Sequence, residues 1–409
     1  MFDPYVIRKD FPMIQNNKEM SSCPMVYFDN AATTFKPQCV IDAEMGYYQH
    51  YTANTHRGDY PIAEHADRAY DEAREKVAKF INAKKTEVVF TSGTSEGLNQ
   101  IANGLKKFLT KGDEVIISLE EHASNVLPWF SLQHEIGIVI KYVPVDSKGR
   151  ITLEGLKSVI SNKTKVVSLA HVSNTLGYVI DIKSLAKLTH EYGAYFVCDA
   201  AQSAPHMKID VKDLDVDFLV FSGHKCVGPT GIGVMYGKYA LLDKMDPLHL
   251  GGGMNTDFDM CGNYGYLITP TKFEAGTQNI AGAIGLGAAL EYLDNIGLDN
   301  IEKYEHELKQ YAIDKLKDIP ELTIYNADSE SGIITFNYKG VHAQDMGTLL
   351  ASKGICVRSG QHCAKLLHNI IGELATVRAS LYFYNTKEEI DQFVEACKKG
   401  GDFLDAFFA

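Results

Sequence analysis

The residues best able to do chemistry include a cysteine on a glycine-containing loop. Residues 358–363 read R-S-G-Q-H-C, which places Cys363 directly after a histidine and five residues after Arg358. Cationic neighbours favour the thiolate form, so such a loop is typical of a nucleophile beside an anion-binding group. A turn with an incidental thiol is the alternative. Residues far from this loop must decide between the two interpretations.

A second loop carries a lysine that suits covalent chemistry. The stretch S-G-H-K-C-V-G-P-T-G confines Ser222, His224 and Lys225 to four residues among glycines, which let a ligand approach the backbone closely. A lysine held in such a loop loses its proton more readily than one in water and can form an imine. An exposed lysine on a glycine-rich turn explains this stretch alone equally well.

Two further loops carry polar groups. T-S-G-T-S-E-G places Thr94 and Ser95 at a helix start, where an anion is favoured, although alone it fits an ordinary N-cap better. D-A-A-Q follows a buried strand, and Asp199 needs a cation or several donors there, so a salt bridge or a cap would satisfy it. Together with the lysine loop, these groups match the phosphate, pyridinium nitrogen and aldehyde of pyridoxal phosphate (PLP).

The elements that position these loops form an α/β pattern. Seven short apolar runs alternate with helix-like segments between residues 86 and 236: EVVFTS, DEVIISL, IVIKYVPV, KVVSLAHV, YFVCDA, DFLVFS and IGVMYG. Several runs are almost continuously apolar, which predicts strands covered by helices on both faces of a mostly parallel sheet. One intervening helix is expected over residues 182–192. Ligands of such sheets bind where strands end, which is where the polar loops lie.

The C-terminal part has a different pattern. We expect helices over residues 300–319 and 343–352, strands at GIITFNY and GICVRS, and a last helix that opens with a capping box between Thr386 and Glu389. The prediction is a large domain over residues 20–285. A smaller α+β domain over residues 286–409, joined by segment 1–19, carries the cysteine loop.

Composition limits the partners. The 409 residues carry 40 basic and 52 acidic side chains, a net charge of −12, without a long basic block, so nucleic acid and membrane surfaces are poor partners. The N-terminus lacks a signal-peptide core, which predicts a cytoplasmic protein. The eight cysteines are scattered without a C-x-x-C pair, so we expect neither a disulfide framework nor a metal site.

The sequence resembles the SufS-type, group II (NifS-like) cysteine desulfurases, class V aminotransferase-like enzymes of the fold-type I PLP group. The ordered motifs that carry the resemblance are Y-F-D-N-A-A-T-T, N-T-H-R-G, G-T-S-E-G, E-E-H-A-S-N-V-L-P-W, H-V-S-N-T-L-G, D-A-A-Q, S-G-H-K, G-P-T-G-I-G, F-E-A-G-T, R-S-G-Q-H-C and R-A-S-L-Y-F-Y-N-T. It implies a large lobe with a mostly parallel seven-stranded sheet, a smaller C-terminal α+β lobe, and a homodimer with shared active sites.

The resemblance also implies roles for individual residues. Lys225 would form the imine, Asp199 would pair with the pyridinium nitrogen, Gln202 would bind the ring hydroxyl, and His122 would stack on the ring. The phosphate would be held by Thr94, Ser95, Ser222 and His224, with Thr277 of the second subunit. Arg378 would clamp the substrate carboxylate with help from Asn174, and Arg358, His56 and Arg57 would line the same pocket.

The implied reaction converts L-cysteine to L-alanine. Cys363 would take the sulfur as a persulfide and pass it to an acceptor protein of the E or U type, for iron–sulfur cluster assembly. His362 and the pocket arginines are candidates to stabilise its thiolate. Two alternatives are a selenocysteine lyase or cysteine sulfinate desulfinase of the same fold, and a non-catalytic sulfur-relay or scaffold subunit.

The sequence departs from the group pattern at four positions. Leu366 replaces a common proline, Asn255 a usual isoleucine and Thr271 a usual tryptophan, while Gln344 stands where the branch with U-type acceptors has histidine. These departures bear on acceptor choice and substrate preference, and Gln344 favours an E-type acceptor.

Overall fold

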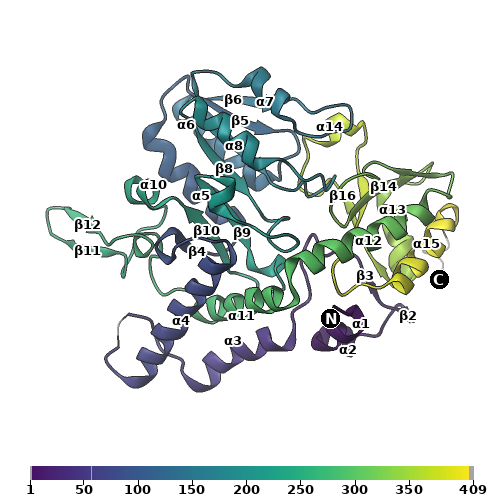
Figure 1. Cartoon of the computed structure of the whole chain (residues 1–409), viewed down its shortest axis with the longest axis horizontal. Helices are drawn as coiled ribbons and strands as arrows, with labels where there is room; N and C mark the ends of the chain where they lie inside the picture. Colours follow the sequence, from purple (N-terminus) through teal and green to yellow (C-terminus); the bar gives the residue numbers. More distant parts are fainter. Residues whose placement is uncertain (1, 57, 405–409) are drawn as a thin grey trace.

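The computed structural model describes residues 2–56 and 58–404. The larger part of the chain surrounds a seven-stranded sheet, and a smaller part that includes both described chain ends surrounds a four-stranded sheet (Figure 1). Loops that carry the candidate residues line one cavity together with residues of the four-stranded sheet.

The large sheet consists of the seven expected strands. They are β4 (Val88–Thr91), β5 (Glu114–Ser118), β6 (Val139–Val143), β7 (Thr164–Ala170), β8 (Tyr195–Asp199), β9 (Phe218–Ser222) and β10 (Gly233–Gly237). Their order is β4-β10-β9-β8-β7-β5-β6, and β10 runs antiparallel to both of its neighbours while the other pairs are parallel. The prediction of a mostly parallel α/β sheet is confirmed.

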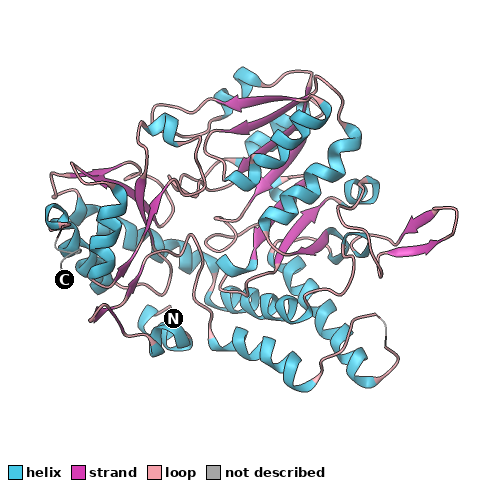
Figure 2. Ribbon diagram, turned by 180° about the vertical axis from the view of Figure 1, so that it is seen from behind, coloured by secondary structure: helices cyan, strands magenta, loops and turns pink. Residues whose placement is uncertain are grey.

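Both faces of this sheet are buried under helices (Figure 2). Alternate residues of β9 belong to two separate apolar clusters, Leu219 and Phe221 to one and Phe218 and Val220 to the other. The helices that contribute residues to the first cluster are α3 (Gln38–His50), α4 (Pro61–Phe80), α7 (Leu153–Val159), α8 (Ile182–Glu191) and α11 (Ile280–Ile296). Those that contribute to the second cluster are α5 (Thr94–Leu105), α6 (Leu127–Ile136) and α10 (Tyr239–Lys244). Burial on two faces explains why the strands are continuously apolar.

The smaller sheet is antiparallel. Its strand order is β13 (Leu322–Ile324), β14 (Ile333–Tyr338), β17 (Thr376–Ser380) and β16 (Arg358–Gly360). The helices that pack against this sheet are α12 (Leu298–Leu316), α13 (Ala343–Ser352) and α15 (Lys387–Lys398). The capping box is present, since Thr386 Oγ1 accepts from Glu389 N and Thr386 N donates to Glu389. The helices expected over residues 300–319 and 343–352 are confirmed.

The prediction of one continuous strand in the C-terminal part was wrong. The run G-I-C-V-R-S is split into β15 (Ile355–Cys356) and β16, because β15 pairs in parallel with β3 (Val26–Tyr27) whereas β16 pairs with β17. The chain changes sheets at Val357. This change carries the backbone from the edge of the small core into the cysteine loop.

The N-terminal segment contacts both parts. It contains α1 (Pro4–Ile7), α2 (Pro12–Asn16) and the hairpin of β1 (Glu19–Met20) and β2 (Cys23–Pro24). Arg8 forms an ion pair with Glu389 of α15 at 2.7 Å, while Phe11 packs into the large core. The division into two domains stays a prediction.

A second hairpin of β11 (Asn255–Phe258) and β12 (Tyr264–Tyr266) projects away from the large sheet (Figure 1). The short helices α9 (Val211–Leu214) and α14 (His368–Ile371) complete the α-helical elements of the described chain. Within residues 2–56 and 58–404, none of the helices has the length and apolar character needed to cross a membrane.

Gly233 allows β10 to approach the turn that precedes α5. A Cβ atom at this position would lie 2.5 Å from the Cα of Gly93 and 2.8 Å from the carbonyl oxygen of Phe221. We expect Gly233→Ala to lower the free energy of unfolding by about 1–3 kcal/mol, because backbone atoms must move to accept the methyl group. Urea unfolding followed by circular dichroism measures the change.

Gly46 of α3 provides the matched control, because a Cβ there meets no atom within 4 Å. Gly46→Ala should leave stability unchanged or raise it, since alanine favours helix. Equal stability of Gly233→Ala and the original protein would contradict the assigned close approach.

Candidate active site

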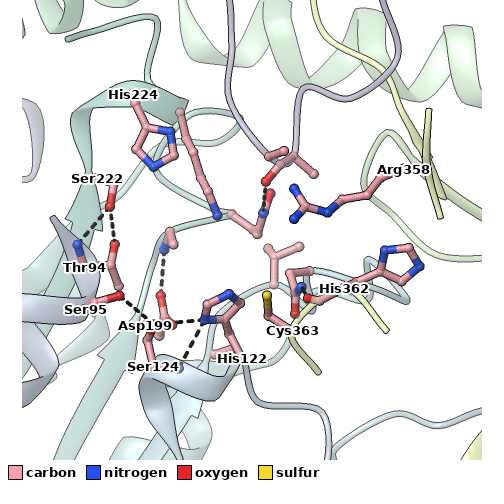
Figure 3. A pocket seen from close by; sticks show the side chains of 18 of the residues that line it. Thr94, Ser95, His122, Ser124, Asp199, Ser222, His224, Arg358, His362 and Cys363 are labelled. Carbon is pink, nitrogen blue, oxygen red and sulfur yellow. Dashed lines mark hydrogen bonds between the residues drawn. The ribbon is translucent and has the colours of Figure 1, made fainter. Parts of the chain in front are cut away.

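A cavity of about 180 Å³ lies where the strand ends of the large sheet face β16 and β17. Because about 10–15 Å³ of such volume is enough to hold one water molecule, it has room for a small ligand. The structure brings most of the predicted residues to its wall: Thr94, Ser95, His122, Asn174, Asp199, Gln202, Ser222, His224, Lys225, Arg358, Cys363 and Arg378. Figure 3 shows Cys363 and His122 pointing toward one another across this space.

Two of the described residues predicted for the site, His56 and Thr277, are not part of this wall. His56 lines a different cavity with Gln278, and Thr277 is exposed to solvent in the single chain. Arg57 lies outside the described residues. The role of Thr277 in a second subunit stays a prediction, whereas the placement of His56 in the same pocket does not hold within one chain.

The start of α5 forms one end of the cavity. Gly93 is the N-cap residue and provides no side-chain cap, so the ordinary N-cap interpretation was wrong. The Thr94 Oγ1 instead lies 2.8 Å from the Ser222 Oγ, and the Ser95 Oγ lies 2.6 Å from the Ser124 Oγ. Hydroxyl groups and the amides of a helix N-terminus, of which Thr94 N already donates to the Ser222 Oγ at 2.8 Å, therefore converge where an anion is favoured.

Asp199 ends β8 at the floor of the cavity. Its Oδ1 accepts a hydrogen bond from Ala201 N at 2.9 Å, and within the described chain it forms no ion pair. The salt-bridge interpretation was therefore wrong, and the backbone amide satisfies only part of the carboxylate. Burial raises the pKa of Asp199, and the nearby Lys225 opposes that shift. A cationic ring nitrogen would provide the missing partner.

Lys225 follows β9 in a short 3₁₀ turn over Gly223–Lys225. The residue is half-buried and lines the cavity, so the interpretation as an exposed surface lysine was wrong. Within the described residues its amine has no hydrogen-bond partner, and only burial and neighbouring charges act on it. Burial lowers the pKa of Lys225 to about 8, with Asp199 acting in the opposite direction, so the neutral, nucleophilic amine is accessible near neutral pH.

His122 stands at the start of a short 3₁₀ turn over Ala123–Asn125. Its Nδ1 accepts from Ser124 N at 3.2 Å, which assigns the ring proton to Nε2. Burial lowers the pKa of His122 to about 4, and the neighbouring Lys225 contributes in the same direction. The imidazole is therefore neutral near pH 7. Sequence reasoning missed Ser124, whose only signal is its place in E-E-H-A-S-N.

Two arginines lie side by side on neighbouring strands of the small sheet. Arg358 of β16 is the register partner of Arg378 of β17. Arg378 donates from Nη1 to the Asn174 carbonyl at 2.7 Å, while Nη2 lies 3.4 Å from Asp29 Oδ1. Its buried Nε has no partner among the described residues. Burial lowers the pKa of Arg378 to about 10, so the guanidinium remains charged and favours an anionic ligand.

The cysteine loop has an unusual backbone. His362 and Cys363 have φ angles of 51° and 57°, in the left-handed region that costs about 1–2 kcal/mol for each L-residue. Two hydrogen bonds restrain them, from Asn174 Nδ2 to the His362 carbonyl at 2.7 Å and from Ala123 N to the Cys363 carbonyl at 2.8 Å. The Cys363 residue is exposed and lines the cavity, so its sulfur reaches both ligand and solvent.

His362 does not supply a positive charge to this sulfur. Its ring is buried on the far side of the loop from the sulfur, with Nε2 at 2.8 Å from Thr376 Oγ1 (Figure 3). Burial lowers the pKa of His362 to about 2, so the ring is neutral. The expectation that it stabilises a thiolate was wrong, and Arg358 and Arg378 are the cationic candidates.

The sequence model of the aminotransferase class-V family matches residues 26–393. The chain belongs to this family. Class-V aminotransferases and their cysteine desulfurase members depend on PLP, and the chain has their fold-type I architecture, as predicted. The residues of the cavity fit that cofactor, because an unpartnered amine, a half-satisfied buried carboxylate and a helix N-terminus with hydroxyl groups surround one space.

Relatives within the class-V family are similar over almost the whole chain. A probable cysteine desulfurase of Halalkalibacterium halodurans is 45% identical over 98% of this chain and 99% of its own length. A cysteine desulfurase of Haloferax volcanii is 40% identical over 96% of each chain. The apo cysteine desulfurase structure from Thermococcus onnurineus superposes with a TM-score of 0.92, 40% identity and 98% coverage of both chains.

Proposed function

We propose that the protein is a PLP-dependent cysteine desulfurase that converts L-cysteine to L-alanine and retains the sulfur as a persulfide on Cys363. The observation that carries the proposal is that Cys363, Lys225 and Arg378 line one cavity from three separate loops and strands. An amine for the cofactor, a guanidinium for a carboxylate and a nucleophilic sulfur are the three groups that this reaction needs. Relatives named as cysteine desulfurases support it.

The cofactor would be held by residues of the large sheet. Lys225 provides the covalent attachment, Asp199 the partner of the ring nitrogen, and Gln202, fixed by a 2.8 Å bond from its Nε2 to the Ala31 carbonyl, the contact to the ring hydroxyl. Thr94, Ser95, Ser222 and His224 bind the phosphate. Bound there, PLP withdraws electrons from the α-carbon of the attached amino acid.

The remaining residues act on the substrate. Arg378 and Arg358 hold the carboxylate, and the unpartnered Nε of Arg378 is one donor that remains for it. The neutral His122 moves protons beside the ring, because Nε2 carries the proton that it gives up and Nδ1, which accepts from Ser124 N, holds the lone pair that takes a proton up. Cys363 attacks the substrate sulfur as the thiolate, because a thiol is a poor nucleophile.

The sulfur transfer balances without an added oxidant. A bond forms between the Cys363 sulfur and the substrate sulfur, and the bond from that sulfur to the substrate β-carbon breaks. The β-carbon keeps the electron pair and takes up a proton, so it is reduced while the enzyme sulfur is oxidised. The sum is L-cysteine plus the Cys363 thiol giving L-alanine plus a persulfide.

The proposal includes a homodimer and an acceptor protein. The exposed Thr277 would complete the phosphate site of a second copy, and His56 would line that copy's pocket. The exposed Cys363 gives an acceptor access to the persulfide for iron–sulfur cluster assembly. Gln344 is exposed in the first turn of α13, where it favours an E-type acceptor over a U-type one.

Release of alanine by the PLP-loaded protein tests the function. L-cysteine with a thiol reductant should give alanine and sulfide in equal amounts over many turnovers. A protein that binds PLP and releases no alanine would be a scaffold rather than an enzyme. Parallel reactions with selenocysteine and cysteine sulfinate show which substrate has the highest kcat/KM.

We expect Arg378→Lys to raise KM for L-cysteine and to lower kcat/KM by about 10- to 100-fold. A lysine replaces the planar fork by a single ammonium group, which loses a charge-assisted hydrogen bond of about 1.5–3 kcal/mol. Steady-state alanine release measures the effect. Arg68→Lys, on the exposed surface of α4, is the matched control and should behave as the original protein. Equal kinetics of both variants would remove Arg378 from the carboxylate site.

The rate of cofactor attachment should depend on the protonation of Lys225. Because burial lowers the pKa of Lys225 to about 8, the neutral amine increases as pH rises toward 8 and then saturates. We expect attachment of PLP to the apoprotein to accelerate from pH 6 to about pH 8 and to level off above it. Rapid-mixing absorbance measures the rate. A rise that continues to about pH 10, as for an ordinary lysine, would contradict this placement of the amine.

A further inference from the structure

Asn174 contacts two parts of the active site that have different tasks. Its Nδ2 donates to the carbonyl of His362, directly before Cys363, at 2.7 Å. Its own backbone carbonyl accepts from Nη1 of Arg378 at 2.7 Å. The family resemblance implies a role for Asn174 at the substrate carboxylate only, and it does not predict the bond to the cysteine loop.

The backbone around Asn174 is held in place by hydrogen bonds. Gly177 N donates to the Ser173 carbonyl at 2.9 Å, which closes a turn around Asn174. Asn326 Nδ2 donates to the Leu176 carbonyl at 2.8 Å. The Thr335 hydroxyl also bonds with the carbonyl of Thr175. Because the backbone on both sides of Asn174 is held, the amide is a fixed point for the loop.

The cysteine loop, in contrast, needs external restraint. Its two consecutive left-handed L-residues, His362 and Cys363, occupy a conformation that a free loop leaves. The bonds from Asn174 and from Ala123 N fix the two successive carbonyls of this pair. The adjoining Ala364 is buried in a small apolar cluster, which anchors only the C-terminal side of the loop.

We infer that Asn174 is a positioning residue that holds the Cys363 loop in its cavity-facing, strained form. The inference deepens the proposed function and rests on it for the role of the thiol. One N–H of the amide is used by the His362 carbonyl, and the second remains for a carboxylate bound at Arg378. The same side chain therefore sets the position of the sulfur relative to the substrate. A role in substrate binding alone would leave the resting loop unchanged when Asn174 is replaced.

Hydrogen exchange of the PLP-loaded protein without substrate tests this inference. Asn174→Ala removes the donor, and Asn174→Asp keeps the shape but turns the donor into an acceptor that repels the His362 carbonyl. In both variants we expect the amides of Ala364 and Leu367, which donate to carbonyls within the loop, to exchange about five- to tenfold faster. Mass spectrometry of a peptide covering residues 360–374 measures the rate.

Thr175→Ala is the matched control. It truncates the neighbouring side chain, whose buried hydroxyl has no partner among the described residues, and leaves the bond to His362 intact. Its loop should exchange at the original rate. Exchange of α15, on the far side of the small core, reports whether a variant has lost its fold. Unchanged loop exchange in both Asn174 variants with an intact α15 would overturn the inference.

Kinetics separate positioning from substrate binding. If Asn174 positions the loop, both Asn174 variants should have a lower kcat for alanine release. The rate at which iodoacetamide alkylates Cys363 in the resting protein should also change, and the factor should be the same in the two variants. A rise in KM with unchanged kcat and unchanged alkylation would also overturn the inference. The exchange and alkylation measurements need no turnover, so they stand even if L-cysteine proves not to be the substrate.

Discussion

Replacement of Cys363 by alanine is expected to lower alanine release from L-cysteine by at least about a thousandfold, the size of effect that loss of a nucleophile produces in other enzymes. The sulfur of the substrate leaves only when another atom accepts it, and Cys363 is the cysteine on the wall of the cavity. The expected loss is in kcat, because the groups that hold the cofactor and the carboxylate remain. Alanine quantified after a fixed time, with and without a reductant, measures the loss.

Cys261 provides the matched control for this experiment. It is also exposed, but it lies on the β11–β12 hairpin outside the cavity, so Cys261→Ala should retain full activity. Cysteine sulfinate and selenocysteine provide a second comparison, since their leaving groups depart without attack by a thiol. If Cys363→Ala released alanine from L-cysteine at the original rate, the nucleophile assignment would be wrong.

Replacement of Lys225 by alanine is expected to abolish both covalent cofactor attachment and activity, again by at least about a thousandfold. The Lys225 amine lies free inside the cavity, and burial keeps its pKa near 8, which makes it the nucleophile for an aldehyde. Borohydride reduction followed by peptide mapping detects the linkage in the original protein and should find none in the variant.

The exposed Lys208 serves as the control, because it lies outside the cavity wall and its removal leaves the site intact. Lys208→Ala should retain the linkage and the activity. A reduced cofactor adduct on a residue other than Lys225 in the original protein would show that the attachment site was assigned wrongly. Retained activity in Lys225→Ala would show the same.

The large sheet could be predicted from sequence because its strands carry their own signal. Burial on both faces demands nearly continuous apolar residues, and all seven runs became strands. The polar residues directly after them, such as Asp199 and Lys225, then had to meet at the carboxyl ends of the strands. The capping box at Thr386 was equally local, since one side chain and one backbone amide decide it.

The features that sequence reasoning missed depend on partners distant in the chain. Nothing within G-I-C-V-R-S shows that its two halves pair with β3 and β17, because strand pairing is decided by the neighbours that the fold brings. The same applies to Asn174, whose bond to the His362 carbonyl joins residues that the fold brings together.

Charge states inside the site were also beyond the sequence. His362 sits directly beside the thiol in sequence, which suggested a cationic helper, yet its ring is buried against Thr376 and stays neutral. At the start of α5, Gly93 takes the cap position, so Thr94 turns to Ser222. Burial and the direction of a side chain, rather than its type, decide what each of these residues does.

The most direct test of the central claim is the intact mass of the PLP-loaded protein after brief exposure to L-cysteine without reductant, followed by peptide mapping. The account predicts one added sulfur atom on Cys363 for each alanine formed in the first turnover. Alanine formed while Cys363 remains unmodified, or a persulfide on a different cysteine, would contradict it.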